Sequence, residues 1–205
     1  DYLRYYLASI TPYSQSDVNF DWEDFMAKIN NELVANIGNF IHRALSFTTS
    51  KFNLRVPEPE AFDELDKGFE VRIKSVAEEV GRKLELNEID RALKEIVDFS
   101  SYCNQYFQRK EPWTGKVGSQ TCLYLSINAV RCLAILLAPY LVYSMEELWR
   151  QLNLQGSVHE QPWASASEMV VKPGRLINRP QILFRKIDRK EITAQLKKLG
   201  QAVPE

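Results

Sequence analysis

Apolar residues between positions 21 and 53 recur every three or four residues, the spacing of one face of a long amphipathic helix. The positions are Phe25, Ile29, Leu33, Ile37, Phe40, Ile41, Ala44 and Leu45, close to a regular 3.6-residue repeat. Asp21 is placed as the N-cap, with Asp24 three residues later. We expect the helix to end before Asn53, because Pro57 and Pro59 mark the following loop.

Similar patterns predict one helix before this long helix and one after it. Residues 1–8 form a short helix with Leu3, Tyr6 and Leu7 on one side, followed by a polar loop that contains Pro12, Ser14, Ser16 and Asp17. Residues 61–83 form a longer helix, whose inward positions are Leu65, Phe69, Ile73, Val76 and Val80.

The next helix is predicted to begin at Asn87, with Asp90 placed as in a capping box. Its buried positions are Ile89, Leu93, Ile96, Val97 and Tyr106. It should stop at Glu111–Trp113, because proline disfavours helix in the residue before it.

Residues 120–138 are apolar nearly all round, which predicts the central helix of a bundle. Asn128 and Arg131 interrupt its most apolar part, Leu123–Ala138, which is also shorter than the roughly 20 residues that a membrane span needs. We therefore expect a core helix and no membrane association. Pro139 ends it, and a short helix follows with Met145, Leu148, Trp149 and Leu152 inward.

After Gly156 the chain to about Arg179 is expected to be irregular. Ile182–Phe184 then form a small apolar anchor, and a basic amphipathic helix with Ile192, Leu196 and Leu199 closes the chain. The fold class predicted is all-α: an antiparallel helical bundle over residues 20–155, preceded by a segment 1–19 and followed by an irregular extension 156–205 that ends in a helix.

Composition narrows the possible functions. The 205 residues carry a formal net charge of −1, so no overall cationic field attracts nucleic acid and any such contact must be local. Acids outnumber bases from Glu58 to Glu95, and bases outnumber acids from Lys172 to Lys198. We expect the three cysteines, Cys103, Cys122 and Cys132, to be reduced core residues in a reducing compartment.

Motifs for catalysis are absent from the sequence. It contains no glycine-rich phosphate loop, no Gly-x-Ser-x-Gly and, with His42 and His159 as its two histidines, no standard zinc spacing. Glu146 and Glu147 are adjacent on a helix and face different directions, as surface charges do. The chain is a poor candidate for an enzyme in its own right.

Two groups of residues are candidates for base recognition. Asn39 and Arg43, spaced i and i+4, lie in one helical row with Asn36 and Glu32. An amide beside a guanidinium can recognise the hydrogen-bonding edges of exposed bases. The same row could equally be an ordinary solvated helix face.

The second group is Pro112–Trp113, with the cations Arg109, Lys110 and Lys116 around it. A tryptophan just past a proline at a helix end can offer a flat face to a base, and aromatics among cations suit single-stranded nucleic acid. It can also be a structural staple. The basic residues from Lys172 to Lys198 could likewise contact phosphates, or be the solvated side of a helix that docks on a partner.

Several segments together resemble methionyl-tRNA synthetases, a family of class I aminoacyl-tRNA synthetases. They are Asp1–Leu7, Asp17–Trp22, Asn31–Arg43, Asn104–Trp113, Pro139–Leu141 and Pro180–Asp188. The cysteinyl, leucyl, isoleucyl and valyl enzymes share the bundle class. The Asn-x-x-x-Arg helix combined with Pro-Trp is most similar to the methionine enzyme.

The resemblance implies a role for each matching position. Trp113 corresponds to the residue on which the first anticodon base, a cytosine, stacks; Asn39 and Arg43 to residues that hydrogen-bond anticodon bases; Asn104 and Pro112 to positions that shape the pocket. The segment 1–19 resembles the end of the stem-contact region, and the final helix a segment that folds back on the catalytic body.

The implied function is recognition of the CAU anticodon of methionine tRNA within a cytoplasmic methionine–tRNA ligase. The family's ATP and methionine motifs would precede Asp1, so the resemblance implies ATP, and in some members zinc, for the catalytic part and no cofactor for this chain. The alternatives are a helical protein-interaction scaffold and the same bundle from another class I synthetase.

Overall fold

A computed structural model describes residues 1–12 and 18–200. The described residues form α1 (Tyr2–Ile10), α2 (Trp22–Lys28), the π-helix η1 (Ile29–Gly38), α3 (Asn39–Phe52), α4 (Glu64–Glu85), α5 (Ile89–Lys110), the 3₁₀ turn η2 (Pro112–Thr114), α6 (Ser119–Leu137), α7 (Val142–Gln151), the 3₁₀ turns η3 (Val158–Glu160) and η4 (Trp163–Ser167), and α8 (Arg189–Lys198). Within these ranges the one β-type pairing is an isolated bridge between Arg55 and Leu176. The predicted all-α class is confirmed; of the predicted polar loop, Ser14, Ser16 and Asp17 lie outside the described residues.

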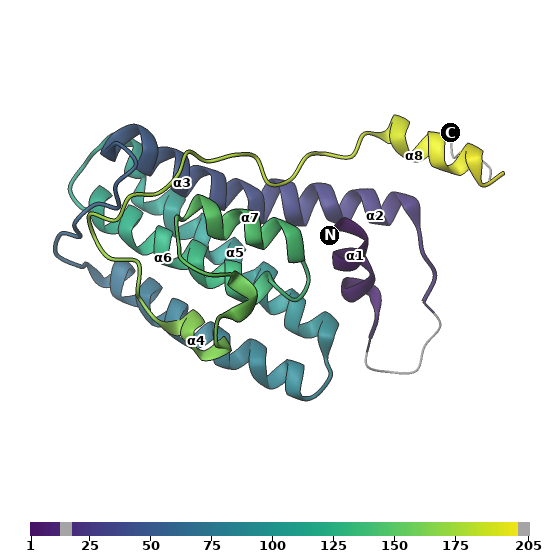
Figure 1. Ribbon diagram of the computed structural model, residues 1–205, viewed down its shortest axis with the longest axis horizontal. Coiled ribbons are helices and arrows are strands. Elements are labelled where there is room, and N and C mark those ends of the chain that lie inside the picture. Colours follow the sequence, from purple (N-terminus) through teal and green to yellow (C-terminus); the bar gives the residue numbers. More distant parts are fainter. Residues whose placement is uncertain (13–17, 201–205) are drawn as a thin grey trace.

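The predicted long helix is present as α2, η1 and α3, which follow one another without a break (Figure 1). The carboxylate of Asp21 accepts a hydrogen bond from the backbone N–H of Asp24 at 2.7 Å, so the predicted N-cap is confirmed. The helix ends at Asn53, whose φ of 49° places it in the left-handed region typical of a helix C-terminus. Every residue of the predicted apolar stripe is buried except Phe25, which is half-buried.

The middle of this helix departs from the regular 3.6-residue repeat that its sequence suggests. Its apolar residues from Phe25 to Leu45 include an unbroken series spaced four apart. In an α-helix such a series drifts by roughly 40° per step, because each turn takes about 3.6 residues. The wider turns of the π-helix offset that drift, and Ile29, Leu33 and Ile37 all stay fully buried.

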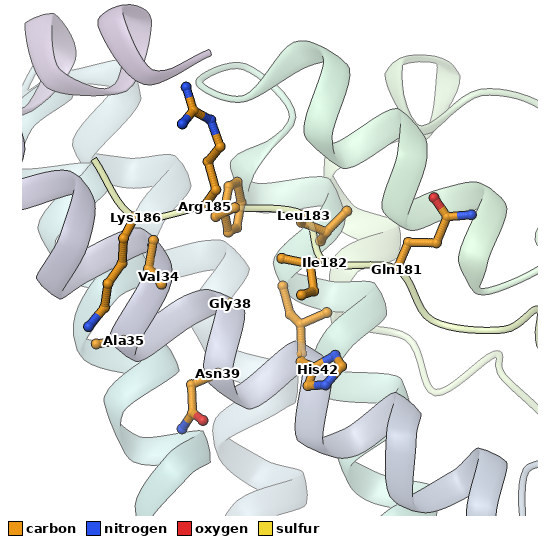
Figure 2. A pocket seen from close by; sticks show the side chains of 12 residues that line it. Val34, Ala35, Gly38, Asn39, His42, Gln181, Ile182, Leu183, Arg185 and Lys186 are labelled. Carbon is orange, nitrogen blue, oxygen red and sulfur yellow. The ribbon is translucent and has the colours of Figure 1, made fainter. Parts of the chain in front are cut away.

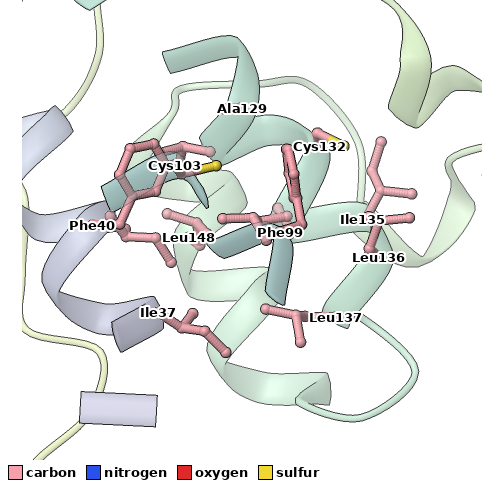
Figure 3. Close-up of a cluster of buried hydrophobic side chains, with 14 of the residues drawn as sticks. Ile37, Phe40, Phe99, Cys103, Ala129, Cys132, Ile135, Leu136, Leu137 and Leu148 are labelled. Carbon is pink, nitrogen blue, oxygen red and sulfur yellow. The ribbon is translucent and has the colours of Figure 1, made fainter. Parts of the chain in front are cut away.

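Helices α3, α4, α5 and α6 pack side by side as an antiparallel bundle, with α7 against α6 (Figure 1). Figure 3 shows part of the core, where Ile37 and Phe40 of the long helix meet Phe99 and Cys103 of α5 and Cys132 of α6. All three cysteines are free and buried, as predicted.

Helix α6 lies at the centre of the bundle, as its composition predicts. It is long and apolar enough to cross a membrane, but 89% of its most apolar window is buried inside the protein. The two residues that interrupt its apolar run have partners in the extension: Asn128 exchanges hydrogen bonds with the backbone of Val171, and the Arg131 guanidinium donates to the carbonyl of Ser165 at 2.6 Å. Both therefore hold the C-terminal extension on the bundle.

Leu3 and Leu7, which were predicted to share one side of α1 with Tyr6, are exposed. Helix α1 buries Tyr6 together with Tyr5, because the Tyr5 hydroxyl reaches Glu32 on the long helix. Leu65 is also exposed, and the next residue, Asp66, is fully buried in its place.

The start of α5 also differs from the prediction. Asn87 has a φ of 58° and forms the turn after α4, so Glu88 is the N-cap and no side chain completes a capping box there. The shift of one residue turns Ile89 out to solvent.

The C-terminal extension runs along the outside of the long helix from the α3 end to the α2 end (Figure 1). Asn30 holds it there through two hydrogen bonds with the backbone of Ile187, each 2.9 Å long. In the predicted apolar anchor Phe184 is buried, whereas Ile182 is 77% exposed. Helix α8 buries Ile192 and Leu196 as predicted and leaves Leu199 exposed.

Candidate nucleic-acid interface

Three hydrogen bonds join the long helix to α5 at a constant offset in sequence. Asn36 donates to Ser101 at 2.8 Å, Asn39 to Asn104 at 3.0 Å, and Arg43 to Gln108 at 3.3 Å, each pair 65 residues apart. The offset is constant because α3 and α5 run in the same direction, so residues one turn apart on one helix face residues one turn apart on the other. We call these three pairs the polar ladder.

The middle of the polar ladder is held by an amide network beneath it. The Asn104 side-chain nitrogen donates to the backbone and side-chain oxygens of Asn36, both at 3.0 Å. Ser100 donates to the same Asn36 oxygen at 3.1 Å. Asn39 uses its amide nitrogen on Asn104, and within the described part of the chain its side-chain oxygen accepts no hydrogen bond. That oxygen is an acceptor available to a ligand.

Arg43 connects the polar ladder to a group of aromatic rings. Its guanidinium carbon lies 4.8 Å from the ring centre of Phe107 and 5.1 Å from that of Trp113, within cation–π range. The Trp113 ring also packs against Phe47 and Phe107, with ring centres 6.2 and 6.3 Å away. Burial lowers the pKa of the Arg43 guanidinium from its ordinary value.

The turn that carries Trp113 is fixed by the end of α5. Glu111 takes up the left-handed conformation with a φ of 45° and ends the helix, and Pro112 begins the following 3₁₀ turn. The Pro112 ring is buried, and it lines a separate cavity of about 270 Å³ with Phe52 and Glu60. Pro112 therefore holds Trp113 in place from behind and does not face the polar ladder.

An ion cluster of the buried Lys110 and Asp66 with the exposed Asp63 anchors the same helix end. The Lys110 ammonium donates to Asp63 at 2.8 Å and to Asp66 at 3.0 Å, and the Tyr106 hydroxyl donates to Asp66 at 2.6 Å. The hydrogen bond from Lys110 lowers the pKa of the Asp63 carboxyl to about 2. Burial raises the pKa of the Tyr106 hydroxyl above its ordinary value. The last turn of α5 is thus tied to the first turn of α4, immediately before Trp113.

The polar ladder borders an open groove of about 370 Å³. The residues that line it are Ala35, Asn36, Asn39, Arg43, Ser101, Asn104, Gln105 and Gln108. Amides, a hydroxyl and one cation line this groove and no carboxylate does, so it presents donors and acceptors suited to the edges of unpaired bases. In the part of the chain that the structure describes, no group of three or more His, Cys, Asp or Glu side chains is placed to hold a metal ion.

The structure brings four of the five predicted site residues together and places the fifth behind them. Asn39, Arg43 and Asn104 line the groove, and Trp113 is half-buried against Arg43; it neither stands free nor is sealed in the core. Of the cations expected around Trp113, Arg109 is exposed, Lys110 is buried in the ion cluster and Lys116 pairs with Glu111 at 2.8 Å.

Sequence reasoning missed Gln108, Phe47 and Phe107. Gln108 lies four residues after Asn104, the same spacing that links Asn39 to Arg43, and that repeated interval could have revealed it. The two phenylalanines carry no such signal, because a buried aromatic on a helix is ordinary core.

Comparison with protein families gives two matches. Residues 66–199 match the family described as "Anticodon-binding domain of tRNA ligase", and residues 1–45 match "tRNA synthetases class I (M)". The first match covers well over half of the chain.

Curated relatives and solved structures agree with these matches. The chain is 38% identical to the methionine–tRNA ligase of Pyrococcus abyssi, over 91% of this chain and 26% of that protein. It is 35% identical to that of Pyrococcus horikoshii, over 100% of this chain and 28% of that protein, so it spans about a quarter of the length of these relatives. The free-state crystal structure of Mycobacterium tuberculosis methionyl-tRNA synthetase superposes with a TM-score of 0.83 over 91% of this chain and 39% of the other; at 24% identity this likeness concerns the fold.

Proposed function

The chain belongs to the anticodon-binding domains of tRNA ligases, and from this premise we propose that it recognises the CAU anticodon of methionine tRNA as part of a methionine–tRNA ligase. The curated relatives named above are methionine–tRNA ligases, which favours methionine tRNA over the tRNAs of the neighbouring class I enzymes. The anticodon loop would lie across the polar ladder, with one base reaching Trp113.

The observation that carries this proposal is the position of Arg43. Its guanidinium stacks on Trp113 while the same group donates to Gln108 of the polar ladder. A base placed here meets an aromatic surface and hydrogen-bonding groups at once, which is the combination that sequence-specific recognition of unpaired bases requires.

The aromatic ring and the hydrogen-bonding groups would make different contributions to the binding free energy. Stacking on an aromatic ring is worth roughly 1–3 kcal/mol per base with little preference among bases. Discrimination would come from Arg43 and Asn39, on the order of 1–3 kcal/mol for each well-formed contact to a base edge. The guanidinium donates only, and the free Asn39 oxygen accepts, so together they suit an edge such as that of cytosine, which carries both acceptors and an amino donor.

The remaining functions belong to the whole ligase. We propose that the catalytic part of that ligase attaches methionine to tRNA with ATP and packs against the α1 end of the bundle. A cytoplasmic location is supported by the three free, buried thiols, which suit a reducing compartment.

The test is aminoacylation by the full-length ligase with Trp113→Ala. We expect kcat/KM for methionine tRNA to fall by about 10- to 100-fold, as the loss of one stacked base implies. Trp163→Phe is the matched control, because Trp163 lies on the far side of the bundle, where its indole donates to Ala77. Circular dichroism and thermal unfolding confirm that both variants fold.

Asn39→Ala and Arg43→Ala complete the test. For these variants we compare kcat/KM for tRNA with the CAU anticodon with kcat/KM for tRNAs in which one anticodon base is changed. The ratio should fall by about tenfold, since each substitution removes one base contact. Unchanged charging by Trp113→Ala would remove the anticodon role from this site. If the protein bound no RNA and instead bound a protein partner, the scaffold function would be favoured.

A further inference from the structure

A second and larger groove lies on the other side of Asn39, between the long helix and the C-terminal extension. It has a volume of about 610 Å³. Figure 2 shows it: Val34, Ala35, Gly38, Asn39, Ile41 and His42 of the long helix form one wall, and Gln181–Lys186 form the other. This volume is within the usual range for small-ligand sites.

Gly38 sets the shape of this groove. A Cβ atom at this position would lie 2.8 Å from the Leu33 carbonyl oxygen and 3.0 Å from a ring carbon of Phe184. Phe184 can therefore sit directly on the helix backbone only because residue 38 has no side chain. The contact seats the extension close to the helix, beside the apolar side chains of Val34, Ala35 and Ile41 that form the floor of the groove.

The charges around the groove are all of one sign. Its lining includes Arg185 and Lys186 and no Asp or Glu, in a chain whose Asp and Glu total 27. The Arg185 guanidinium is paired with Glu191 at 3.1 Å. Lys186 is exposed, and within the described residues its ammonium has no ion-pair partner. In Figure 2 Lys186 and Asn39 extend to the same side of the helix, whereas Arg185 points away.

The two grooves are adjacent. Ala35 and Asn39 line both of them, so Asn39 forms the ridge where the groove along the polar ladder meets the groove along the extension. A flexible polymer that occupies one groove can continue into the other without leaving the surface.

We propose that this second groove binds the nucleotide adjacent to the base held at the polar ladder, with its phosphate on Lys186 and its base against the floor between Gly38 and His42. The inference rests on the proposed function and extends it to a second subsite. The acid-free lining and the unpaired ammonium complement a phosphate. The His42 imidazole and the apolar floor offer a stacking surface, and the free Asn39 oxygen at the ridge accepts from whichever base lies nearer.

The occupant favoured is a nucleotide of the same RNA strand, because the groove is adjacent to a surface of amides and stacked aromatics. An acidic peptide would also be drawn to Lys186, but it would make no use of a stacking floor. The two differ in whether the nucleobase contributes to binding.

The test measures binding of a methionine anticodon hairpin RNA to the full-length protein over a range of salt concentrations. For Lys186→Ala the slope of log K against log salt should become less steep by about 0.7, the value for one contact to single-stranded RNA, which is a loss of about fivefold in affinity at about 0.1 M salt. The matched control is Lys172→Ala, an exposed lysine of the same extension that lines neither groove. Its slope should be unchanged.

A second arm uses hairpins in which one nucleotide at a time is abasic. Beside the position that responds to Trp113→Ala, one neighbouring position should lose about fivefold or more in affinity in the unmodified protein and clearly less in His42→Ala. Such coupling between RNA and protein changes shows that a base, and not only a phosphate, occupies the groove.

The outcomes separate the two proposals. If Trp113→Ala weakens binding while Lys186→Ala matches Lys172→Ala and no abasic position couples to His42, the second subsite is overturned and the anticodon role stands. If Trp113→Ala and Lys186→Ala both bind as the unmodified protein does, both proposals fail. A Lys186 effect without any abasic coupling overturns the base-binding part of the inference.

Discussion

The guanidinium carbon of Arg43 lies 5.1 Å from the ring centre of Trp113, and the same side chain donates to Gln108 at 3.3 Å. One planar group therefore holds the stacking surface and the polar ladder in fixed relation. A lysine would keep the positive charge, but it lacks the flat face that covers the indole and the fork of donors that reaches Gln108.

The first prediction follows from that geometry. Arg43→Lys should lose nearly as much affinity for the anticodon hairpin as Arg43→Ala, about 5- to 30-fold, because the planar contacts and not the charge are used. Fluorescence anisotropy with labelled hairpin measures both variants. Affinity in Arg43→Lys close to that of the unmodified protein would show that charge alone is sufficient.

Asn104 should affect selectivity more than affinity. Asn104→Ala frees the Asn39 amide and removes one of the two side-chain donors to Asn36, so discrimination among anticodon bases should fall by about tenfold, with a loss of roughly 1–3 kcal/mol in unfolding free energy. Asn178→Ala is the control, since it also loses an amide hydrogen bond, to the carbonyl of Arg150, away from the site. Equal selectivity in the two variants would contradict the role given to Asn104.

Gly38→Ala should destabilise the docking of the extension. The new Cβ would meet Leu33 and Phe184 at 2.8 and 3.0 Å, an overlap that costs about 1–3 kcal/mol. Limited proteolysis should cut the extension faster in this variant. Gly68→Ala provides the contrast: Gly68 is within α4 and its Cβ would meet only the Tyr102 hydroxyl at 4.0 Å, so that variant should gain about 0.5–1 kcal/mol.

Lys110→Met should be the most damaging single change among these. It leaves the fully buried Asp66 carboxylate without its cation, which costs about 3–5 kcal/mol in urea unfolding. Combining it with Asp66→Asn should recover part of that loss, because no uncompensated charge then remains. Lys94→Met, which breaks the exposed pair with Asp98, should change stability by less than about 0.5 kcal/mol.

The Asp63 carboxyl should make the unfolding free energy of the protein depend on pH in the acidic range. Its folded pKa of about 2 is below the usual value of about 4, so its ion pair stabilises the fold above pH 4 and is lost as the pH falls towards 2. The difference in unfolding free energy between the unmodified protein and Asp63→Asn should thus be constant above about pH 5, decrease as the pH falls through about 2, and be lost below that. Asparagine keeps the N-cap of α4, so a difference that showed no decrease between about pH 5 and pH 2 would assign the effect to something other than the charge.

The sequence predicted the bundle because its helices carry strong apolar stripes and well-placed breaks. Asp21, Asn53 and Pro139 mark ends that the structure confirms, and the apolar helix α6 is central as its composition requires. The π-helix was not predictable in the same way. A four-residue apolar spacing fits an α-helix over two turns, and only its persistence from Phe25 to Leu45 requires a wider turn.

The candidate site was predictable only in part. The i, i+4 spacing placed Asn39 and Arg43 on one face, but spacing within one helix gives no information on which helix lies opposite, so Gln108 was not identified. The burial of Lys110 and Asp66 was not predicted, because charged side chains are rarely buried unless they are paired. Their pairing depends on contacts between α4 and α5 that no local pattern encodes.

The constant offset of 65 residues has a mechanical consequence. Sliding the long helix past α5 by a single turn, about 5.4 Å, would separate all three pairs together, whereas any smaller slip meets the interlocked core beneath them. The three pairs of the polar ladder thus have one allowed alignment, and they are kept or lost together.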